Sequence, residues 1–504
     1  MVLPILGLTV LAAALRFSFL DRQSFWFDEA VTVELSRKSL WGMLTALPDT
    51  ESTPPAYYVL VWGWSRLVGT SETELRALSA LLGTVTIPIA YAAGRVLVSH
   101  RAGLYSAALV TCSPLLVWYS QEARAYALLV GLTALSLLVF ATALVRPSVR
   151  RLALWAAVAS LALATHYFAI FLVGGEVVWL LISHRRCRAA WGAAAGVATA
   201  GAALLPLAVH QQSTNQTWWI AARPLSNRIT ETLRQFITGE YGRSEALSVV
   251  AFLVLLFTAA GLVWLTNRGE RQGGTIALSL GAAGVLAPLA LASTELDKFF
   301  YRNMIGAWVP LAIALATVLA SQRIRRLGLL LLAAACGIQL WSLAAIVQRP
   351  ALHRDDWRSA LSALGPNDGR RAIITEPSYQ KAPIHLYRPE IRQMPTAGAQ
   401  VTEIAFLGFR RLPLDFRPPA PFKRVEQRMV QHIALVRYRS PTERLVKPDD
   451  LARRGSFDPS GVLIEAGIRN TALPAAERGG PRAPRRQAAA ATASPQPSAR
   501  AETP

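Results

Sequence analysis

About eleven apolar runs, separated by short charged links, limit what this chain can fold into. Most of them have roughly the twenty residues that an α-helix needs to cross the hydrocarbon core of a membrane. Hydrophobic residues make up 53% of the 504 residues and charged residues 16%, and the mean hydropathy is +0.33. This composition excludes an ordinary soluble protein and predicts a polytopic α-helical membrane protein. The predicted spans are residues 2–20, 76–98, 102–119, 126–145, 152–165, 167–183, 190–209, 246–266, 275–292, 303–320 and 327–347.

Two apolar segments near the N-terminus admit more than one interpretation. Residues 2–20 have the length of a signal peptide, but they lack a basic n-region and a small-residue cleavage site. We therefore expect a retained first helix. Pro54–Val68 is short and opens with two prolines, so it either crosses the membrane or lies along its surface as an interfacial helix.

The arginines indicate which links face the cytoplasm. If residues 54–68 lie on the surface, alternate links hold thirteen arginines and one acid, Glu270, all on the same side. This arrangement places the N-terminus in the cytoplasm, whereas a full crossing by residues 54–68 would place it outside; we favour the first. The net charge of +21 then reflects orientation in the membrane, and we expect no nucleic-acid partner. The arginine-bearing links lie near residues 95–101, 146–151, 185–188, 268–271 and 323–326.

The outward loop after the first run carries two adjacent carboxylates among aromatic residues, in the order Trp26, Phe27, Asp28, Glu29. A carboxylate beside the bilayer is partly desolvated, which increases its basicity. Transfer of a sugar to a hydroxyl needs such a base to remove the proton. The pair is therefore a candidate catalytic site, and the alternative is a solvated loop beside an aromatic belt.

Further charged and aromatic residues lie in the outward links, where charges next to apolar spans are costly unless they are paired or functional. Two cations in one link suit a lipid phosphate, which arginine binds with two parallel hydrogen bonds. The candidate substrate-binding residues are Arg76, Glu122, Arg124, His166, Tyr167, Lys298 and Arg302.

A structural alternative stays open for each of these residues. Glu122 and Arg124 form an ion pair that anchors two helix ends in the alternative interpretation, and Arg76 anchors a span. His166 is then a structural histidine in a turn, and the cations near residue 300 belong to the aromatic belt.

The sequence offers no nucleotide or metal site of a familiar kind. No glycine-rich phosphate loop follows a strand, no HExxH spacing occurs, and Cys112, Cys187 and Cys336 are isolated. A donor sugar already activated by a lipid phosphate needs no nucleotide site. A divalent metal ion is compatible with the chain, although no ligand cluster supports it.

The composition changes after residue 349. We predict a transmembrane domain over residues 1–349, a small α/β domain outside the membrane over 350–440, an extension over 441–471 and a disordered tail over 472–504. The α/β domain should contain a helix from Asp355 to about Leu364, and strands over residues 371–375, 403–407 and 432–436.

Taken together, an ordered series of motifs resembles the GT-C glycosyltransferases of the protein-mannosyltransferase class, also called glycosyltransferase family 39 or the RgtA/B/C/D-like domain. The resemblance spans roughly residues 10–365. One departure is Thr53, where the family often has His before two prolines. The matching motifs are Phe27-Asp28-Glu29-Ala30, Ser52 to Tyr58, Glu74 to Ala80, Tyr119 to Tyr126, Thr165-His166-Tyr167, Phe300 to Asn303 and Asp355 to Arg358.

The resemblance implies an inverting transferase that takes a sugar from a polyprenyl-phosphate donor at the outer face of a bacterial cytoplasmic membrane. Asp28 would be the general base, Glu29 a binding or orienting partner, and Arg76 the support of that pair. Glu122 and Arg124 would line the donor or acceptor cavity. The acceptor is a glycan, a glycolipid or a protein, and neither it nor the sugar follows from the sequence.

Two other function classes stay open. A transporter or flippase of lipid-linked sugar would use the same charges as a pathway, but such proteins are expected to have repeated halves and charges at mid-membrane. A non-catalytic membrane scaffold would tolerate the loss of Asp28.

Overall fold

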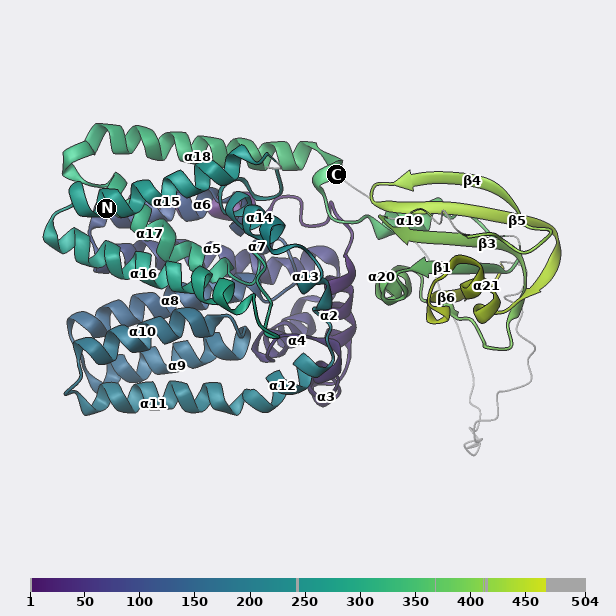
Figure 1. Ribbon diagram of the computed structural model, residues 1–504, viewed down its shortest axis with the longest axis horizontal. Helices are drawn as coiled ribbons and strands as arrows, with labels where there is room; N and C mark the ends of the chain where they lie inside the picture. Colours follow the sequence, from purple (N-terminus) through teal and green to yellow (C-terminus); the bar gives the residue numbers. More distant parts are fainter. Residues whose placement is uncertain (1, 242–243, 368, 411, 413–415, 468–504) are drawn as a thin grey trace, which may run out of the picture.

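A computed structural model describes residues 2–241, 244–367, 369–410, 412 and 416–467. A bundle of long helices is followed by a small C-terminal sheet domain beyond one end of the bundle (Figure 1). The N-terminus lies at the opposite end. The expected tail over residues 472–504 falls outside the described residues.

Each of the eleven predicted apolar runs lies in one helix or in two consecutive helices. Among the described residues, six helical segments are long and apolar enough to cross a membrane, or seven if the bent pair α6 and α7 is one span. The multi-pass membrane class is therefore confirmed. The bundle helices are α1 (Val2–Phe17), α5 (Glu72–Leu97), α6 (His100–Cys112), α7 (Pro114–Ser120), α8 (Tyr126–Val145), α9 (Val149–Thr165), α10 (Ala169–Ser183), α11 (Arg188–Ala203), α12 (Leu205–Ser213), α15 (Ala246–Trp264), α16 (Arg268–Leu291), α17 (Trp308–Leu319) and α18 (Arg325–Gln348).

The span over residues 102–119 is broken because Pro114 has no N–H to donate to the carbonyl of Val110, four residues earlier. The helices on either side of the break are bent by 60°. Arg16 of α1 is buried and supplies the missing donor, with its Nη2 3.0 Å from the Val110 carbonyl oxygen. Its Nη1 donates to the carbonyl of Thr111 at 3.3 Å. The break is therefore stabilised by a buried side chain from the first helix.

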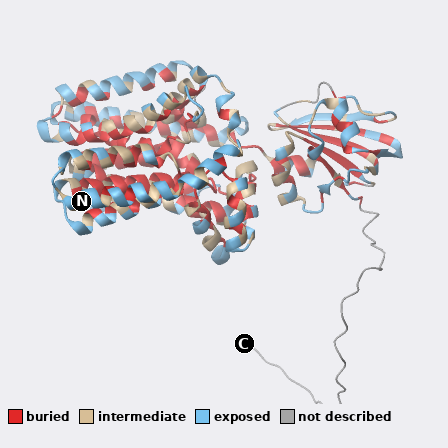
Figure 2. Cartoon of the chain, turned by 60° about the horizontal axis from the view of Figure 1, so that its bottom comes forward, coloured by how far each residue is buried: buried red, intermediate tan, exposed pale blue. Residues whose placement is uncertain are grey.

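Small residues allow the bundle helices to approach closely. A Cβ added to Gly273 of α16 would lie 1.9 Å from the carbonyl oxygen of Leu97, and one added to Gly328 of α18 would lie 1.9 Å from that of Leu319. The buried residues gather where helices face each other, and exposed ones cover the outside of the bundle (Figure 2).

The links that we expect to face outward form a layer of short helices at the end of the bundle nearest the sheet domain (Figure 1). The apolar piece at residues 54–68 becomes α4, which has thirteen residues. At 1.5 Å per residue this is about 20 Å, too short for the hydrocarbon core. The layer consists of α2 (Phe27–Arg37), α3 (Leu40–Thr50), α4 (Ala56–Val68), α13 (Trp218–Ala221) and α14 (Leu225–Thr238).

The C-terminal domain is a six-stranded sheet in the order β2-β6-β1-β3-β5-β4. β1 and β3 are parallel and the other neighbours are antiparallel. The three expected strands are present, as is the expected helix, which begins at Trp357. The elements are α19 (Trp357–Ala363), β1 (Arg371–Glu376), α20 (Lys381–Tyr387), β2 (Arg392–Gln393), β3 (Ala399–Phe409), β4 (Lys423–Val430), β5 (Ile433–Val446), α21 (Pro448–Gly455) and β6 (Val462–Glu465).

The sheet continues beyond residue 440, where we expected the domain to end. β5 runs to Val446, and β6 lies between β1 and β2 in the sheet. Sequence reasoning missed both because residues 441–445 are exposed, begin with a proline and include only one large apolar residue, Leu445, and because β6 has only four residues. Residues 441–465 therefore belong to the sheet domain.

Candidate active site

A cavity of about 1660 Å³ lies between the layer of outer helices and the C-terminal domain. Seven of the nine site residues predicted from the sequence line it, and Glu29 and Arg76 do not. The seven are Asp28, Glu122, Arg124, His166, Tyr167, Lys298 and Arg302.

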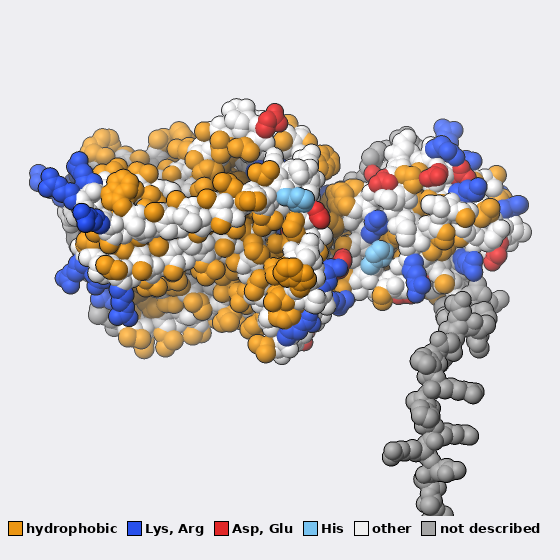
Figure 3. Space-filling model, turned by 90° about the horizontal axis from the view of Figure 1, so that it is seen from below, with side chains coloured by type: hydrophobic (Ala, Val, Ile, Leu, Met, Phe, Trp, Pro, Cys, Tyr) orange, Lys and Arg blue, Asp and Glu red, His pale blue; other side chains and the backbone are white. Residues whose placement is uncertain are grey.

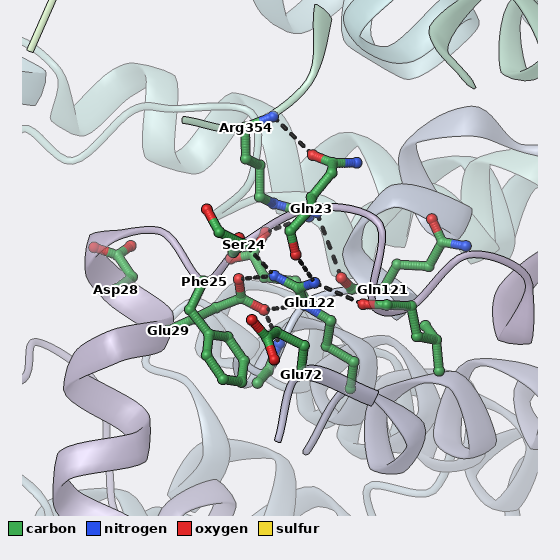
Figure 4. Close-up of polar contacts among 12 residues, drawn as sticks. Gln23, Ser24, Phe25, Asp28, Glu29, Glu72, Gln121, Glu122 and Arg354 are labelled. Atoms are coloured by element: carbon green, nitrogen blue, oxygen red, sulfur yellow. Dashed lines mark hydrogen bonds and ion pairs between the residues drawn. The ribbon is translucent and has the colours of Figure 1, made fainter. Parts of the chain in front are cut away.

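The two adjacent carboxylates of the first loop have different surroundings because they lie on neighbouring positions of a helix. α2 begins at Phe27, so Asp28 lies in the first helical turn, where the exposed N–H groups favour a negative charge. Its side chain is 18% exposed and its Oδ2 lies 3.3 Å from Nη1 of Arg302. Figure 4 shows Asp28 pointing away from the polar cluster that contains Glu29.

Glu29 is fully buried and binds Arg76 of α5 through both carboxylate oxygens. Arg76 donates from Nε to Oε1 at 2.7 Å and from Nη2 to Oε2 at 2.5 Å. The backbone N–H of Ala123 donates to Oε1 at 2.9 Å. Burial opposes the charged form of Glu29, but Arg76 overcomes this effect and holds the pKa of the carboxyl below its usual range. This geometry suits the orienting role that the resemblance implies for Glu29.

Arg76 also fixes the loop that leads to α2. Its remaining N–H groups donate to the backbone carbonyls of Leu20, Gln23 and Ser24, at 2.7, 2.7 and 3.1 Å. One guanidinium therefore binds the end of the first apolar run, the loop and Glu29 together.

Arg302 is the cation that pairs with the carboxylate of Asp28, and four aromatic rings surround it. Its guanidinium carbon lies 5.2–5.9 Å from the ring centres of Trp26, Tyr126, Trp219 and Phe300. The link that carries Arg302 and Lys298 is itself anchored by Arg228 of α14, which binds both oxygens of Asp297 at 2.7 Å.

Glu122 and Arg124 do not pair with each other, so the helix-anchoring ion pair considered above is absent. Arg124 binds both oxygens of Glu51 at 2.5 and 2.7 Å. Glu122 accepts a hydrogen bond from Nη2 of Arg354 at 2.9 Å. Each residue therefore joins the short link between α7 and α8 to a different part of the chain.

His166 is buried in the wall of the cavity as a neutral imidazole. Its Nδ1 accepts a hydrogen bond from the backbone N–H of Phe168 at 3.2 Å, which leaves the ring proton on Nε2. Burial, with smaller effects of Arg302 and Arg124, lowers the pKa of His166 to about 3. The neighbouring Tyr167 donates from its hydroxyl to Oε1 of Gln211 at 2.7 Å.

Sequence reasoning missed the contribution of the C-terminal domain to this site. Ser24 Oγ donates to the carbonyl of Asp355 and accepts from the N–H of Trp357, both at 3.0 Å. The backbone N–H of Phe25 donates to the hydroxyl of Tyr387 at 2.6 Å. The only signal in the sequence was the motif at residues 355–358, which gave no indication that Arg354 enters the cavity.

Glu51 was missed for a similar reason. It follows the last residue of α3, in a loop with several other polar residues, and its sequence neighbours do not distinguish it from a solvated acid.

Within the described ranges, no group of three or more His, Cys, Asp or Glu side chains is arranged to hold a metal ion.

Comparison with known proteins supports the GT-C resemblance. Residues 52–210 match the family model described as dolichyl-phosphate-mannose-protein mannosyltransferase. No curated protein matches the chain. The crystal structure of ArnT from Cupriavidus metallidurans bound to undecaprenyl phosphate is similar over 86% of this chain and 97% of that one, with a TM-score of 0.56 and 13% identity. The chain therefore has the GT-C fold, as the motifs predict.

Two more distant structures match with lower scores. The oligosaccharyltransferase of Archaeoglobus fulgidus covers 72% of this chain and 55% of its own, with a TM-score of 0.45 and 13% identity. The match to the mycobacterial arabinofuranosyltransferase AftD covers 86% of this chain and 41% of AftD, with a TM-score of 0.43 and 15% identity.

We expect the two carboxylates of the first loop to differ in their effect on stability. Glu29→Ala leaves Arg76 buried without its partner and should lower the free energy of unfolding by about 3–5 kcal/mol. Asp28→Asn, in a partly open cavity, should lower it by less than about 1 kcal/mol. Urea-dependent pulse proteolysis of the purified protein in detergent measures both. Equal losses would contradict the assignment of Glu29 to a positioning role.

His166 should not titrate in the folded protein between pH 5.5 and 8. The ratio of the transfer rates of wild type and His166→Gln should then be constant over this range, and a change with a midpoint near pH 6.5 would contradict this expectation.

Since burial lowers the folded-state pKa of His166, protonation of this residue favours the unfolded chain. The stability that neutral His166 contributes is complete above pH 6.5 and is lost as the pH falls toward 3.

Proposed function

We propose that this protein is an inverting glycosyltransferase that moves a sugar from a polyprenyl-phosphate donor to an acceptor hydroxyl at the outer face of a membrane. The observation that carries the proposal is the position of Asp28, the one member of the acidic pair that lines the cavity, beside the cation Arg302. The GT-C fold and the undecaprenyl phosphate bound to ArnT support the class of donor.

In the proposed reaction, Asp28 accepts the proton of the acceptor hydroxyl as its oxygen attacks the anomeric carbon of the donor sugar. The bond between that carbon and the phosphate oxygen breaks at the same time, on the opposite face. The configuration is therefore inverted, and polyprenyl phosphate leaves with the bonding electrons.

Lys298 and Arg302 line the cavity and provide positive charge for the donor phosphate. Arg302 is held among aromatic rings, so its position is fixed before the donor binds. Bound phosphate would compete with Asp28 for this guanidinium and free the carboxylate to act as a base. Neutral His166 offers its Nε2 proton as an additional hydrogen-bond donor.

The distribution of arginines supports an outward-facing cavity. Figure 3 shows groups of Lys and Arg side chains at the end of the bundle opposite the C-terminal domain, an apolar surface beyond them, and a further group beside the C-terminal domain. Two of the arginine-bearing links meet at the end opposite that domain, since Arg101 donates to the backbone carbonyl of Arg325 at 2.8 Å. By the positive-inside rule this end lies in the cytoplasm, and the cavity faces outward. The bacterial origin stays a prediction.

Asp28→Asn should abolish measurable transfer, or lower it by about 10²–10⁴-fold, because the amide cannot accept the proton. The assay supplies membranes that contain the protein with a panel of labelled polyprenyl-phosphate sugars. Asp21→Asn, in the same loop but exposed, is the matched control and should transfer label like wild type. Full transfer by Asp28→Asn would exclude it as the base, and no transfer by wild type with any donor would favour the transporter or scaffold alternatives.

The orientation predicts which side chains are accessible from outside. In a Cys187→Ser background, Asp21→Cys should react with a membrane-impermeant maleimide on intact spheroplasts, whereas Arg186→Cys should react only after lysis. Both positions are exposed in the structure. The reverse pattern would place the cavity on the cytoplasmic face.

A further inference from the structure

Arg354 reaches from the C-terminal domain into the wall of the cavity. Its side chain is 6% exposed. Its Nη2 donates to Oε2 of Glu122 at 2.9 Å and to the carbonyl of Trp118 at 3.1 Å. Its guanidinium carbon lies 4.1 Å from the centre of the Trp118 ring, and its backbone N–H donates to Oε1 of Gln23 at 2.7 Å. Main chain and side chain are thus both fixed to the transmembrane domain, as Figure 4 shows for Gln23, Glu122 and Arg354.

Glu122 uses only half of its carboxylate in these contacts. Oε2 binds Arg354, whereas Oε1 is buried and has no hydrogen-bond partner among the described residues. Buried acceptors in native proteins nearly always have a donor. Since Glu122 lines the cavity, a molecule bound there can supply the missing donor.

Among the groups of the proposed donor, only the sugar hydroxyls can satisfy this oxygen. Burial raises the pKa of Glu122, Arg354 and Arg302 act against this effect, and Glu29 and Asp28 add to it. The phosphodiester of the donor has no proton to donate, and it has the cations Lys298 and Arg302 available in the same cavity. A hydroxyl group carries no charge and donates one hydrogen bond, which satisfies Oε1.

We infer that Glu122 binds a hydroxyl of the donor sugar through Oε1, and that Arg354 of the C-terminal domain is the positioning residue that holds it there. This inference rests on the proposed transferase function. It assigns the C-terminal domain a part in the active site: residues 351–355 line one wall of the cavity, and Arg354 sets the orientation of a substrate-binding carboxylate.

Two variants test the inference with the labelled donor that the wild type accepts. In Glu122→Gln, Arg354 can donate only to the amide oxygen, so the NH₂ group takes the place of Oε1 and a donor replaces an acceptor. Arg354→Met leaves Glu122 without its anchor. Each should lower kcat/KM for the donor about 10- to 100-fold. The double variant should be no worse than the more severe single variant, since Arg354 acts through Glu122.

Donor analogues that lack one hydroxyl each provide a readout that a purely structural role would not change. The analogue that lacks the hydroxyl bound by Glu122 should be a poorer donor than the parent sugar for wild type. For Glu122→Gln, the same analogue and the parent sugar should be equally good donors. Arg354→Lys should restore part of the rate lost in Arg354→Met. The matched control is Arg358→Met. This arginine of the same segment does not line the cavity, donates to the carbonyl of Asp21 at 2.9 Å, lies 3.7 Å from Glu72, and should leave transfer unchanged when replaced.

The outcomes separate this inference from the proposed function. If Asp28→Asn is inactive while Glu122→Gln and Arg354→Met transfer label like Arg358→Met, the transferase stands and the inference is wrong. The inference is also wrong if the double variant loses as much kcat/KM as the product of the two single losses. It is equally wrong if wild type and Glu122→Gln have the same ratio of kcat/KM between the parent donor and every deoxy analogue. A wild type that transfers no label overturns both.

Discussion

The buried pair of Glu29 and Arg76 is the interaction on which the site depends. It joins α2 to the start of α5, and the same guanidinium binds three carbonyls of the loop that leads from α1 into α2. A charge pair without solvent is costly to form and far more costly to break. Its effect is therefore to fix geometry: α2 has one rotation about its axis in which Glu29 faces Arg76, and that rotation directs Asp28 into the cavity.

Two further buried pairs extend this arrangement around the cavity. Arg124 binds Glu51, and Arg354 binds Glu122, so the link between α7 and α8 is held by the first loop on one side and by the C-terminal domain on the other. The Ala123 N–H bond to Glu29 connects this link to the first pair. Three separate segments that line the cavity are thus held by buried pairs of an arginine and a carboxylate: the first loop, the link between α7 and α8, and residues 351–355.

The break between α6 and α7 places the Glu122 link where these pairs can form. Pro114 ends the hydrogen-bond ladder of α6, and Arg16 donates to the carbonyls of Val110 and Thr111 at the break. Inside a membrane a backbone carbonyl without a donor is unfavourable, so a break at this depth needs such a partner. The buried arginine of the first helix is thus a condition for the shape of the site.

The sequence by itself determined the membrane class, the positions of the apolar helices, and the acidic pair as the candidate site. These follow from local rules, because each segment in lipid must satisfy its own backbone hydrogen bonds and must be apolar over a fixed length. Only the tertiary structure decided that Asp28 faces the cavity and Glu29 faces Arg76. It also decided that Glu122 pairs with Arg354, 232 residues away, and not with Arg124. Such pairings depend on which helix ends meet when the bundle packs. The boundary of the sheet domain was likewise decided by tertiary structure, because the four-residue strand β6 belongs to the sheet only through its pairing with β1 and β2.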